Sequence, residues 1–176
     1  MIPLYILGLL QRYGPQHGYQ IKKIIAEQLS DFTQIKLPTI YYHLEKMQSD
    51  GLLNASNEKA DNRPEKTIYT ITEKGIANFI YKLKSSLTLE YRPTFPSDAI
   101  FYFSDHLEIS EISSHLTAYI QKLKVIIATI QNHRIDTLRF VPKESQKMVF
   151  IIFDHHERHY QSELAWAIES LDSLNK

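Results

Sequence analysis

One stretch decides how this chain folds: residues 37–49, LPTIYYHLEKMQS, which are followed by Asp50-Gly51. Its apolar side chains recur at the spacing of one helix face, and they are Ile40, Leu44 and Met47. Proline is tolerated in the first turn, where its missing N–H would have no partner, and glycine favours a helix end. The polar groups of the opposite face come from Thr39, Tyr42, His43 and Lys46. We therefore expect a helix that buries one side and offers hydrogen bonds on the other.

Further elements are predicted on both sides of this helix. Residues 2–13 are heavily apolar and end at Gly14-Pro15, where a helix cannot continue. Residues 17–29 place isoleucines and leucines at helical spacing, with lysines turned outward. Residues 52–56 and 67–71 are suited to strands, and the polar segment between them predicts one hairpin with a charged tip.

A fourth helix and a stiff linker follow the hairpin. Thr72 is a predicted N-cap for a helix that reaches about Glu90. Pro93 and Pro96 then restrict the backbone of the next segment. The order helix, helix, turn, helix, hairpin, helix is that of a winged helix-turn-helix. We predict such a domain over residues 1–91.

A winged helix-turn-helix predicts DNA binding. The major groove of B-DNA admits one α-helix, and the polar groups of residues 39–46 suit base edges and phosphates. The hairpin tip adds three cations suited to phosphate or minor-groove contact, so binding should weaken as salt rises, and they are Lys59, Arg63 and Lys66. A tip whose charges are merely solvated is the alternative, and it stays open.

The charge of the chain is neutral overall but differs between its halves. The 176 residues carry 20 Lys+Arg against 20 Asp+Glu and no cysteine. Residues 1–92 have a net charge of +3 and residues 93–176 have −3, so the basic half carries the predicted DNA-binding motif. The sequence has neither a cysteine nor an apolar run long enough to span a bilayer. It therefore predicts a cytoplasmic protein without disulfides or membrane contact.

Two long helices are predicted in the second half. From Ile112 to Ile130 apolar residues recur in steps of four and three, which is typical of a coiled-coil seam. A last helix from Lys143 repeats the pattern. We expect a C-terminal helical, coiled-coil-like dimerisation domain over residues 92–176, so the fold class is mainly α with a small β-hairpin. The predicted dimer interface comprises Leu116, Leu123, Ile130, Phe153, Tyr160, Leu164 and Leu171. Packing of these seams against the chain's own winged domain is the alternative.

Five ordered segments of the first half resemble the PadR family of bacterial transcriptional regulators, and they are residues 5–10, 18–21, 38–44, 50–53 and 69–75. The similarity covers about residues 2–90, whereas the second half is similar only in length, heptads and helix content. The resemblance implies a homodimeric repressor that binds an inverted-repeat operator. It also implies release by a small molecule or another signal through the C-terminal domain.

The resemblance places the recognition helix on Pro38 to Gln48 and the wing on Ala55 to Thr67. Tyr19 follows Gly18 at the start of the second helix, where it either touches the DNA backbone or packs in the fold. The predicted DNA-binding residues are Tyr19, Lys36, Pro38, Thr39, Tyr41, Tyr42, His43, Lys46, Lys59, Arg63 and Lys66. Many members have proline or a small residue where this chain has Tyr42-His43, so the operator sequence stays open.

The last helix holds two further candidates. In some members of the family that the chain resembles, an aromatic residue near a dimer-interface pore stacks on flat effectors. Phe150, Phe153 and Trp166 are therefore candidates for a small hydrophobic or aromatic effector, although a core role for Trp166 is favoured. His155 and His159 lie one helical turn apart, but the zincin order His-Glu-x-x-His is absent. We predict no metal site here and favour a pH- or charge-sensitive interface.

Two other classes of function were weighed against a regulator. A protein-interaction adaptor that kept the winged fold but lost DNA binding is the alternative, because the charge of the domain is modest. An enzyme is disfavoured, since the sequence contains no glycine-rich phosphate loop, nucleophile elbow or paired carboxylates. We expect no cofactor.

Overall fold

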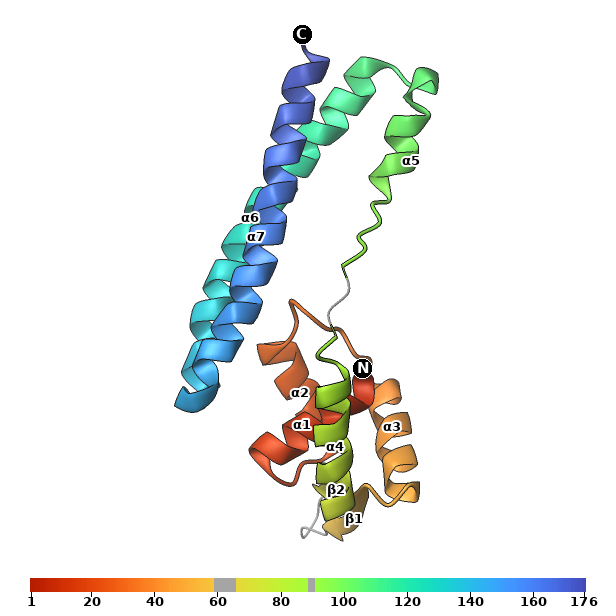
Figure 1. Cartoon of the computed structure of the whole chain (residues 1–176), viewed down its shortest axis with the longest axis vertical. Coiled ribbons are helices and arrows are strands. Elements are labelled where there is room, and N and C mark those ends of the chain that lie inside the picture. Colours follow the sequence, from red (N-terminus) through yellow and green to blue (C-terminus); the bar gives the residue numbers. More distant parts are fainter. Residues whose placement is uncertain (59–65, 89–90) are drawn as a thin grey trace. The chain divides into compact units, whose positions relative to one another are not determined.

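The computed structural model describes residues 1–58, 66–88 and 91–176 (Figure 1). The chain divides into two compact units, which comprise Met1–Tyr91 and Arg92–Lys176. Within the described residues, no helix is both long enough and apolar enough to cross a membrane. The predicted fold class is confirmed: the chain is mainly helical, with one two-stranded antiparallel hairpin.

Three helices pack around the core of the first unit, and they are α1 (Ile2–Tyr13), α2 (Gly18–Gln28) and α3 (Leu37–Ser49). Each of them contributes side chains that are completely or almost completely buried, among them Leu7, Ile21 and Leu44. The buried positions repeat at three- and four-residue spacing, as the periodicity predicts. Burial of an aliphatic side chain of this size stabilises a fold by about 1.5–3 kcal/mol, so the shared core fixes how the three helices cross.

The hairpin consists of β1 (Leu53–Glu58) and β2 (Lys66–Ile71). Its antiparallel register pairs Leu53 with Ile71 and Glu58 with Lys66. Gln16, in the turn between α1 and α2, exchanges two backbone hydrogen bonds with Tyr69 at 3.1 and 2.9 Å. This bridge attaches the turn to the edge of β2, so the wing and the helices form one unit.

A fourth helix, α4 (Glu73–Ser85), is joined tightly to the start of the wing. Its N-cap Thr72 accepts a hydrogen bond from the backbone N–H of Gly75 at 3.0 Å. A Cβ atom on Gly75 would overlap the carbonyl oxygen of Leu52 and lie 2.7 Å from Ile71 Cγ1. Glycine is therefore needed here for close approach. The fourth helix was predicted to reach about Glu90, but it ends at Ser85, where serine hydroxyls bond to backbone carbonyls of the last turn.

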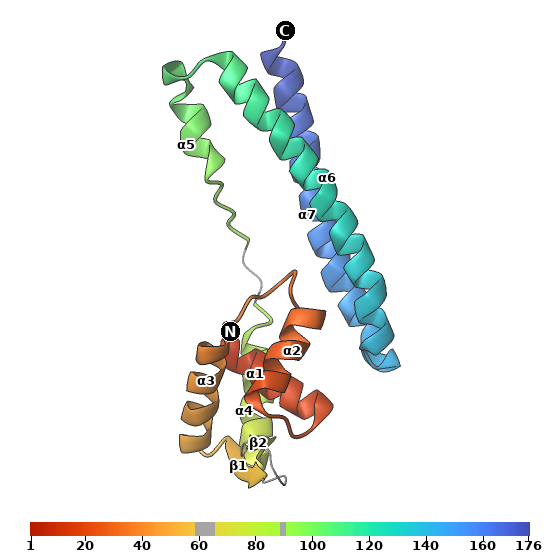
Figure 2. The ribbon, with the colours of Figure 1, turned by 180° about the vertical axis from the view of Figure 1, so that it is seen from behind.

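The second unit is dominated by two long antiparallel helices, α6 (Ile109–Phe140) and α7 (Lys143–Leu174), which pack along each other (Figure 1). Sequence periodicity did not predict the short helix α5 (Ser97–Tyr102) or the 3-10 turn Ser104–His106 that precede them. Six residues are too few for a repeating pattern. Seen from behind in Figure 2, α5 and the first turns of α6 lie at the same end of this unit as the C-terminus.

The apolar seams of α6 and α7 face each other within one chain. Phe153 is completely buried, and its ring meets the ring of His133 on α6 at a centroid distance of 5.7 Å. All seven residues predicted for a dimer interface are buried or half-buried in this way, and they are Leu116, Leu123, Ile130, Phe153, Tyr160, Leu164 and Leu171. The two helices of one chain therefore cover much of each seam, and the assignment of these residues to a dimer interface stays a prediction.

The seam also contains a charged side chain that the sequence pattern did not single out. Glu157 is only 9% exposed, and its carboxylate accepts hydrogen bonds from Arg134 at 2.9 Å and from Gln131 at 2.6 Å. Gln161 adds a third hydrogen bond at 3.2 Å. A buried carboxylate needs such partners because its desolvation is costly. These polar contacts set the register of α6 against α7.

We expect Gly75→Ala to lower the melting temperature of the protein. Alanine favours a helix over glycine by about 1 kcal/mol, so a substitution without steric conflict would stabilise α4. The overlap with Leu52 reverses this sign, because forced overpacking costs about 1–3 kcal/mol. Thermal unfolding followed by circular dichroism measures the effect, and Lys84→Ala, at an exposed position of α4, is the control. A higher melting temperature for Gly75→Ala would contradict the close approach.

Candidate DNA-binding interface

The orientation of α3 follows from its apolar side. Ile40, Leu44 and Met47 are buried against the rest of the first unit. The opposite side is open: Tyr42 is 59% exposed, and Lys46 is exposed one turn further on. Thr39 and His43 belong to the same side and are half-buried. The four polar residues predicted to face DNA therefore share one accessible face.

Hydrogen bonds from the segment after the wing hold the C-terminal end of α3. Lys74 Nζ donates to the backbone carbonyl of Asp50 at 2.7 Å. The hydroxyl of Thr72 lies 2.9 Å from the carbonyl oxygen of Gly51 and 3.1 Å from that of Leu52. Lys74 thus satisfies the carbonyl of the α3 C-cap, and Thr72 contacts the carbonyls of the two residues that follow it. The recognition helix is thereby tied to the start of α4.

The crossing of α2 and α3 depends on a small residue at the start of α2. A Cβ atom on Gly18 would lie 2.6 Å from Cε1 of Tyr41, so only glycine lets this ring approach so closely. Tyr41 is 39% exposed and packs in the fold as well as facing solvent. The next residue, Tyr19, is 63% exposed, and its ring stacks on the ring of His17 at 6.4 Å. An exposed phenol at the start of α2 is available to a ligand outside the unit.

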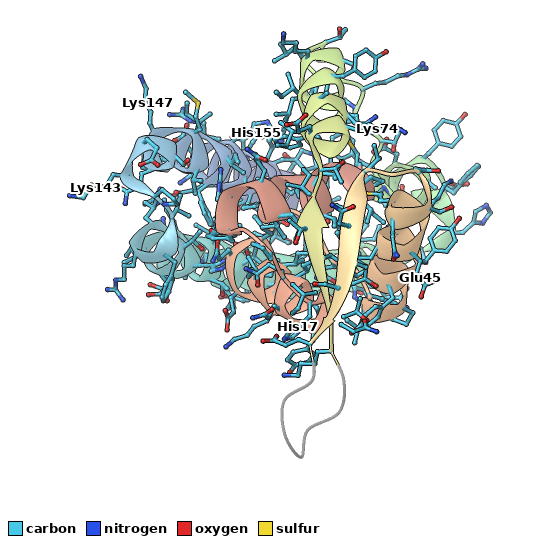
Figure 3. All side chains as sticks on the ribbon, turned by 90° about the horizontal axis from the view of Figure 1, so that it is seen from below. His17, Glu45, Lys74, Lys143, Lys147 and His155 are labelled. Atoms are coloured by element: carbon cyan, nitrogen blue, oxygen red, sulfur yellow. The ribbon has the colours of Figure 1, made fainter. Side chains whose placement is uncertain are left out.

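His17 is a candidate residue that the sequence reasoning missed. Its Nδ1 accepts a hydrogen bond from the backbone N–H of Gln20 at 3.2 Å, and the Gln20 side chain accepts one from the backbone N–H of His17 at 3.0 Å. This reciprocal pair is a capping box. The glutamine three residues on was the signal that could have identified it. Figure 3 shows His17 beside the end of the hairpin at which the described parts of both strands stop.

Two histidines of this surface favour the neutral form. Burial lowers the pKa of His17 below its ordinary value of 6.5, the positive charge of Lys66 lowers it further, and Glu58 opposes the shift. Burial also lowers the pKa of His43, and the charges of Lys46 and the chain's amino terminus add to the effect. A neutral imidazole has one donor and one acceptor nitrogen. At neutral pH, His43 can therefore both donate and accept a hydrogen bond.

The remaining candidate residues are distributed around α3 and the wing. Lys36 is the exposed N-cap of α3, and Pro38 lies in its first turn. Lys66 is exposed at the start of β2. Lys59 and Arg63, predicted for the wing tip, lie outside the described residues. Figure 3 also labels Glu45, an acidic residue on the solvent side of α3.

The second unit contains a cavity of about 870 Å³ between α5, α6 and α7. Of the predicted effector residues, Trp166 lines it, whereas Phe150 and Phe153 do not. Phe150 is about half exposed and lies under the guanidinium of Arg134 at 5.3 Å, and Phe153 is in the core. Tyr160, a predicted interface residue, also lines the cavity. The structure therefore divides the predicted aromatic group between a cavity, an exposed face and the core.

Two of the histidines of α7 lie within hydrogen-bond distance of each other. Nε2 of His155 and Nε2 of His159 are 3.0 Å apart, so one ring donates a hydrogen bond to the other. Both rings are exposed. Nowhere in residues 1–58, 66–88 and 91–176 do three or more histidine, aspartate or glutamate side chains gather as metal ligands would.

We expect His17→Asn to reduce the loss of stability at acid pH. The folded chain binds a proton at His17 less readily than the unfolded chain does, because the pKa of His17 is lowered. The stabilisation is therefore complete above pH 6.5 and decreases as the pH falls toward the folded-state value. Asparagine is also a good N-cap but does not titrate. The difference between the melting temperatures at pH 7.5 and pH 5.0 should be smaller in the variant than in the unmodified protein. Equal differences in the two proteins would contradict a pH-sensitive cap at His17.

Comparison with known proteins agrees with this arrangement. The model of the "Transcriptional regulator PadR-like family" matches residues 6–80, which include most of α1, all of α2 and α3, both strands and the first part of α4. The "Negative transcriptional regulator PadR" of Bacillus subtilis is 34% identical over 70 residues. That alignment covers 40% of this chain and 38% of the relative's length.

Two solved structures of the Bacillus subtilis protein are similar over nearly the whole chain. PadR in complex with operator DNA has a TM-score of 0.82 at 22% identity and covers 98% of both chains. PadR in complex with p-coumaric acid has a TM-score of 0.73 at 22% identity, over 99% of this chain and 96% of the other. At this identity the structures show a shared fold. The family consists of transcriptional regulators and not of enzymes, in agreement with the sequence prediction. Residues 6–80 thus match the PadR-like family of transcriptional regulators, and the whole chain has the fold of the solved PadR structures.

Proposed function

We propose that this protein is a repressor that binds an inverted-repeat operator as a homodimer and is released by a small molecule acting on the second unit. The geometry of α3 is the observation that supports DNA binding in this proposal. Its apolar side is buried, its C-terminal end is held by a hydrogen bond from Lys74, and its polar side is accessible. A helix presented in this way fits the major groove of B-DNA.

The residues of the interface divide into two roles. Tyr42, His43 and Thr39 have hydroxyl and imidazole groups that read base edges, and Lys46 binds either a base or a phosphate. Lys36 and Lys66 are exposed cations on either side of them and contact phosphates, as do Lys59 and Arg63 by position. Tyr19 lies against the sugar-phosphate backbone, while Pro38 and Tyr41 shape the first turn of α3.

The relatives support the repressor reading and the release by an effector. The aligned Bacillus subtilis protein is described as a negative regulator, and solved structures of it contain operator DNA and p-coumaric acid. By analogy, this chain lowers transcription until an effector binds its second unit. Its place of action is the cytoplasm, where a bacterial regulator meets its operator.

An exposed apolar stripe on α7 is the surface that we assign to the second copy of the chain. Met148, Ile151 and Ile152 recur at helical spacing and are exposed, on the side of α7 that does not face α6. His155 continues this stripe by one turn. Contiguous exposed apolar side chains mark interaction surfaces, and a two-fold dimer presents two recognition helices about one DNA turn apart.

We expect substitutions on α3 and on the wing to have different effects on DNA binding. His43→Ala and Tyr42→Ala should weaken binding to the selected operator by about 1–3 kcal/mol and relax its sequence preference. Lys66→Ala should weaken binding to every DNA sequence by a similar factor. It should also reduce the salt dependence of the affinity by about one released counterion. Electrophoretic shifts on an operator selected from genomic fragments, with a scrambled duplex beside it, measure both effects.

The same measurement separates a regulator from an adaptor that has lost DNA binding. Lys176→Ala, at the C-terminus of the second unit, is the matched control for the loss of one charge. A dimer that shifts no genomic fragment at low salt would rule out the regulator and leave the adaptor. Equal losses on the operator and the scrambled duplex for His43→Ala would contradict its role in base recognition.

We expect Ile151→Glu to dissociate the dimer. A carboxylate at this exposed position disturbs neither the α6–α7 seam nor the core, but its burial between two copies would be costly. Sedimentation velocity should show a monomer for the variant and a dimer for Ser173→Glu, an exposed control on the same helix. A dimeric Ile151→Glu protein would exclude this stripe as the interface.

A further inference from the structure

The cavity of the second unit combines aromatic rings with negative charge. It is lined by residues of α5 and the segment before it, of the first part of α6, and of the second half of α7. Five aromatic residues surround it, and they are Phe95, Phe101, Tyr119, Tyr160 and Trp166. Its volume of about 870 Å³ is within the range of pockets that hold drug-sized molecules.

Two glutamates give the cavity its charge. Glu111 and Glu163 line it together with His115 and His159, and among the described residues no lysine or arginine does. The second unit is also the acidic half of the chain, because residues 93–176 carry a net charge of −3. An anionic ligand would therefore lack a cationic partner in this cavity, whereas a cation would have two carboxylates.

Hydrogen bonds hold both carboxylates in position before any ligand arrives. The phenol of Tyr119 donates to Glu163 Oε1 at 3.0 Å, and burial together with this bond raises the pKa of Tyr119 to about 12. Tyr119 therefore stays the donor at neutral pH. Glu111 Oε2 accepts from the backbone N–H of Glu108 at 3.2 Å, as part of the capping box of α6. Preorganised charges of this kind lose little freedom when a ligand binds.

The aromatic rings suit a cation as well. The rings of Phe101 and Trp166 meet edge to face, with centroids 5.5 Å apart and an angle of 85° between their planes. This contact holds the tryptophan of α7 against α5. The face of an indole attracts a cation more strongly than the face of any other side chain. Trp166 is 37% exposed, so part of its ring remains accessible to a ligand.

We propose that this cavity binds a bulky aromatic monocation and discriminates against anions of the same shape. Carboxylates of Glu111 and Glu163 balance the charge of the ligand, while its rings pack among those of Phe101 and Trp166. The ligand class differs from p-coumaric acid, the carboxylic acid bound by the solved relative. As an effector site it rests on the proposed function, but binding of the cation to the cavity does not.

The test uses two ions of nearly equal shape and opposite charge, tetraphenylphosphonium and tetraphenylborate. Trp166 is the only tryptophan of the chain, so its fluorescence reports binding to the full-length protein directly. Titrations are made in sodium buffer at pH 8. We expect tetraphenylphosphonium to bind with saturation and at least about 10-fold more tightly than tetraphenylborate, because of the two fixed carboxylates.

Variants that neutralise one carboxylate at a time identify the groups responsible for the preference for the cation. Glu163→Gln and Glu111→Gln should each reduce the preference for the cation several-fold, whereas Glu169→Gln, an exposed control on α7 outside the cavity, should leave it unchanged. Equal binding of the two ions by the unmodified protein, or no saturable binding by fluorescence and calorimetry, would overturn the proposal. So would an unchanged preference in both cavity variants.

A DNA-shift experiment keeps this proposal distinct from the proposed function. If the cation fails to bind while the protein still shifts the operator, the proposed ligand site is wrong and the proposed regulatory function is supported. If the cation binds with the expected preference while no genomic fragment is shifted, the ligand site stands and the regulator is wrong. Release of the operator by tetraphenylphosphonium, weakened in Glu163→Gln, would support both.

Discussion

Burial of the apolar side of α3 is the constraint on which the rest of the DNA-binding unit depends. Ile40, Leu44 and Met47 can leave water together only if the helix rolls to one angle against α1 and α2. That angle directs Tyr42 and Lys46 outward before any DNA is present. Each contact to a base contributes less free energy than the core that orients it. The accessible face of α3 is consequently formed by the core alone, and the sequence preference that we propose depends on the side chains that occupy this face.

Polar interactions at the edges of the core then fix details that apolar packing leaves loose. Hydrogen bonds from Lys74 and Thr72 hold the end of α3, and the capping box of His17 holds the start of α2. The two backbone bonds between Gln16 and Tyr69 attach the wing to the helices. Such bonds are individually modest, at about 0.5–1.5 kcal/mol each, but they are directional. They hold the wing, α2 and α3 together as one rigid unit.

In the second unit, apolar burial and polar contacts likewise determine how the helices pack. Its two long helices bury their seams against each other, and Glu157 with its polar partners fixes their register. Apolar residues left over on α7 form the exposed stripe that we assign to a second copy of the chain, and the space left beside α5 is a cavity lined by aromatic rings and two carboxylates. A ligand there regulates DNA binding only if it binds the DNA-competent and the released forms with different affinities. The charge of the cavity decides which ligands can do so.

Periodicity and turn chemistry in the sequence determined the helices of the winged domain, the hairpin, the polar face of α3 and the family, because these signals are local to a few turns of chain. The register that brings Leu52 against Gly75, the capping role of His17 and the short helix α5 required the tertiary structure. So did the partner of each seam: a heptad pattern shows that Leu123 or Phe153 is buried, but the same pattern fits a second chain or a neighbouring helix. The cavity is still harder to predict from the sequence, because Glu163 and Tyr119 are 44 residues apart and meet only when α6 packs on α7. The sequence thus determined which surfaces are apolar or charged, and long-range packing decided which of them face one another.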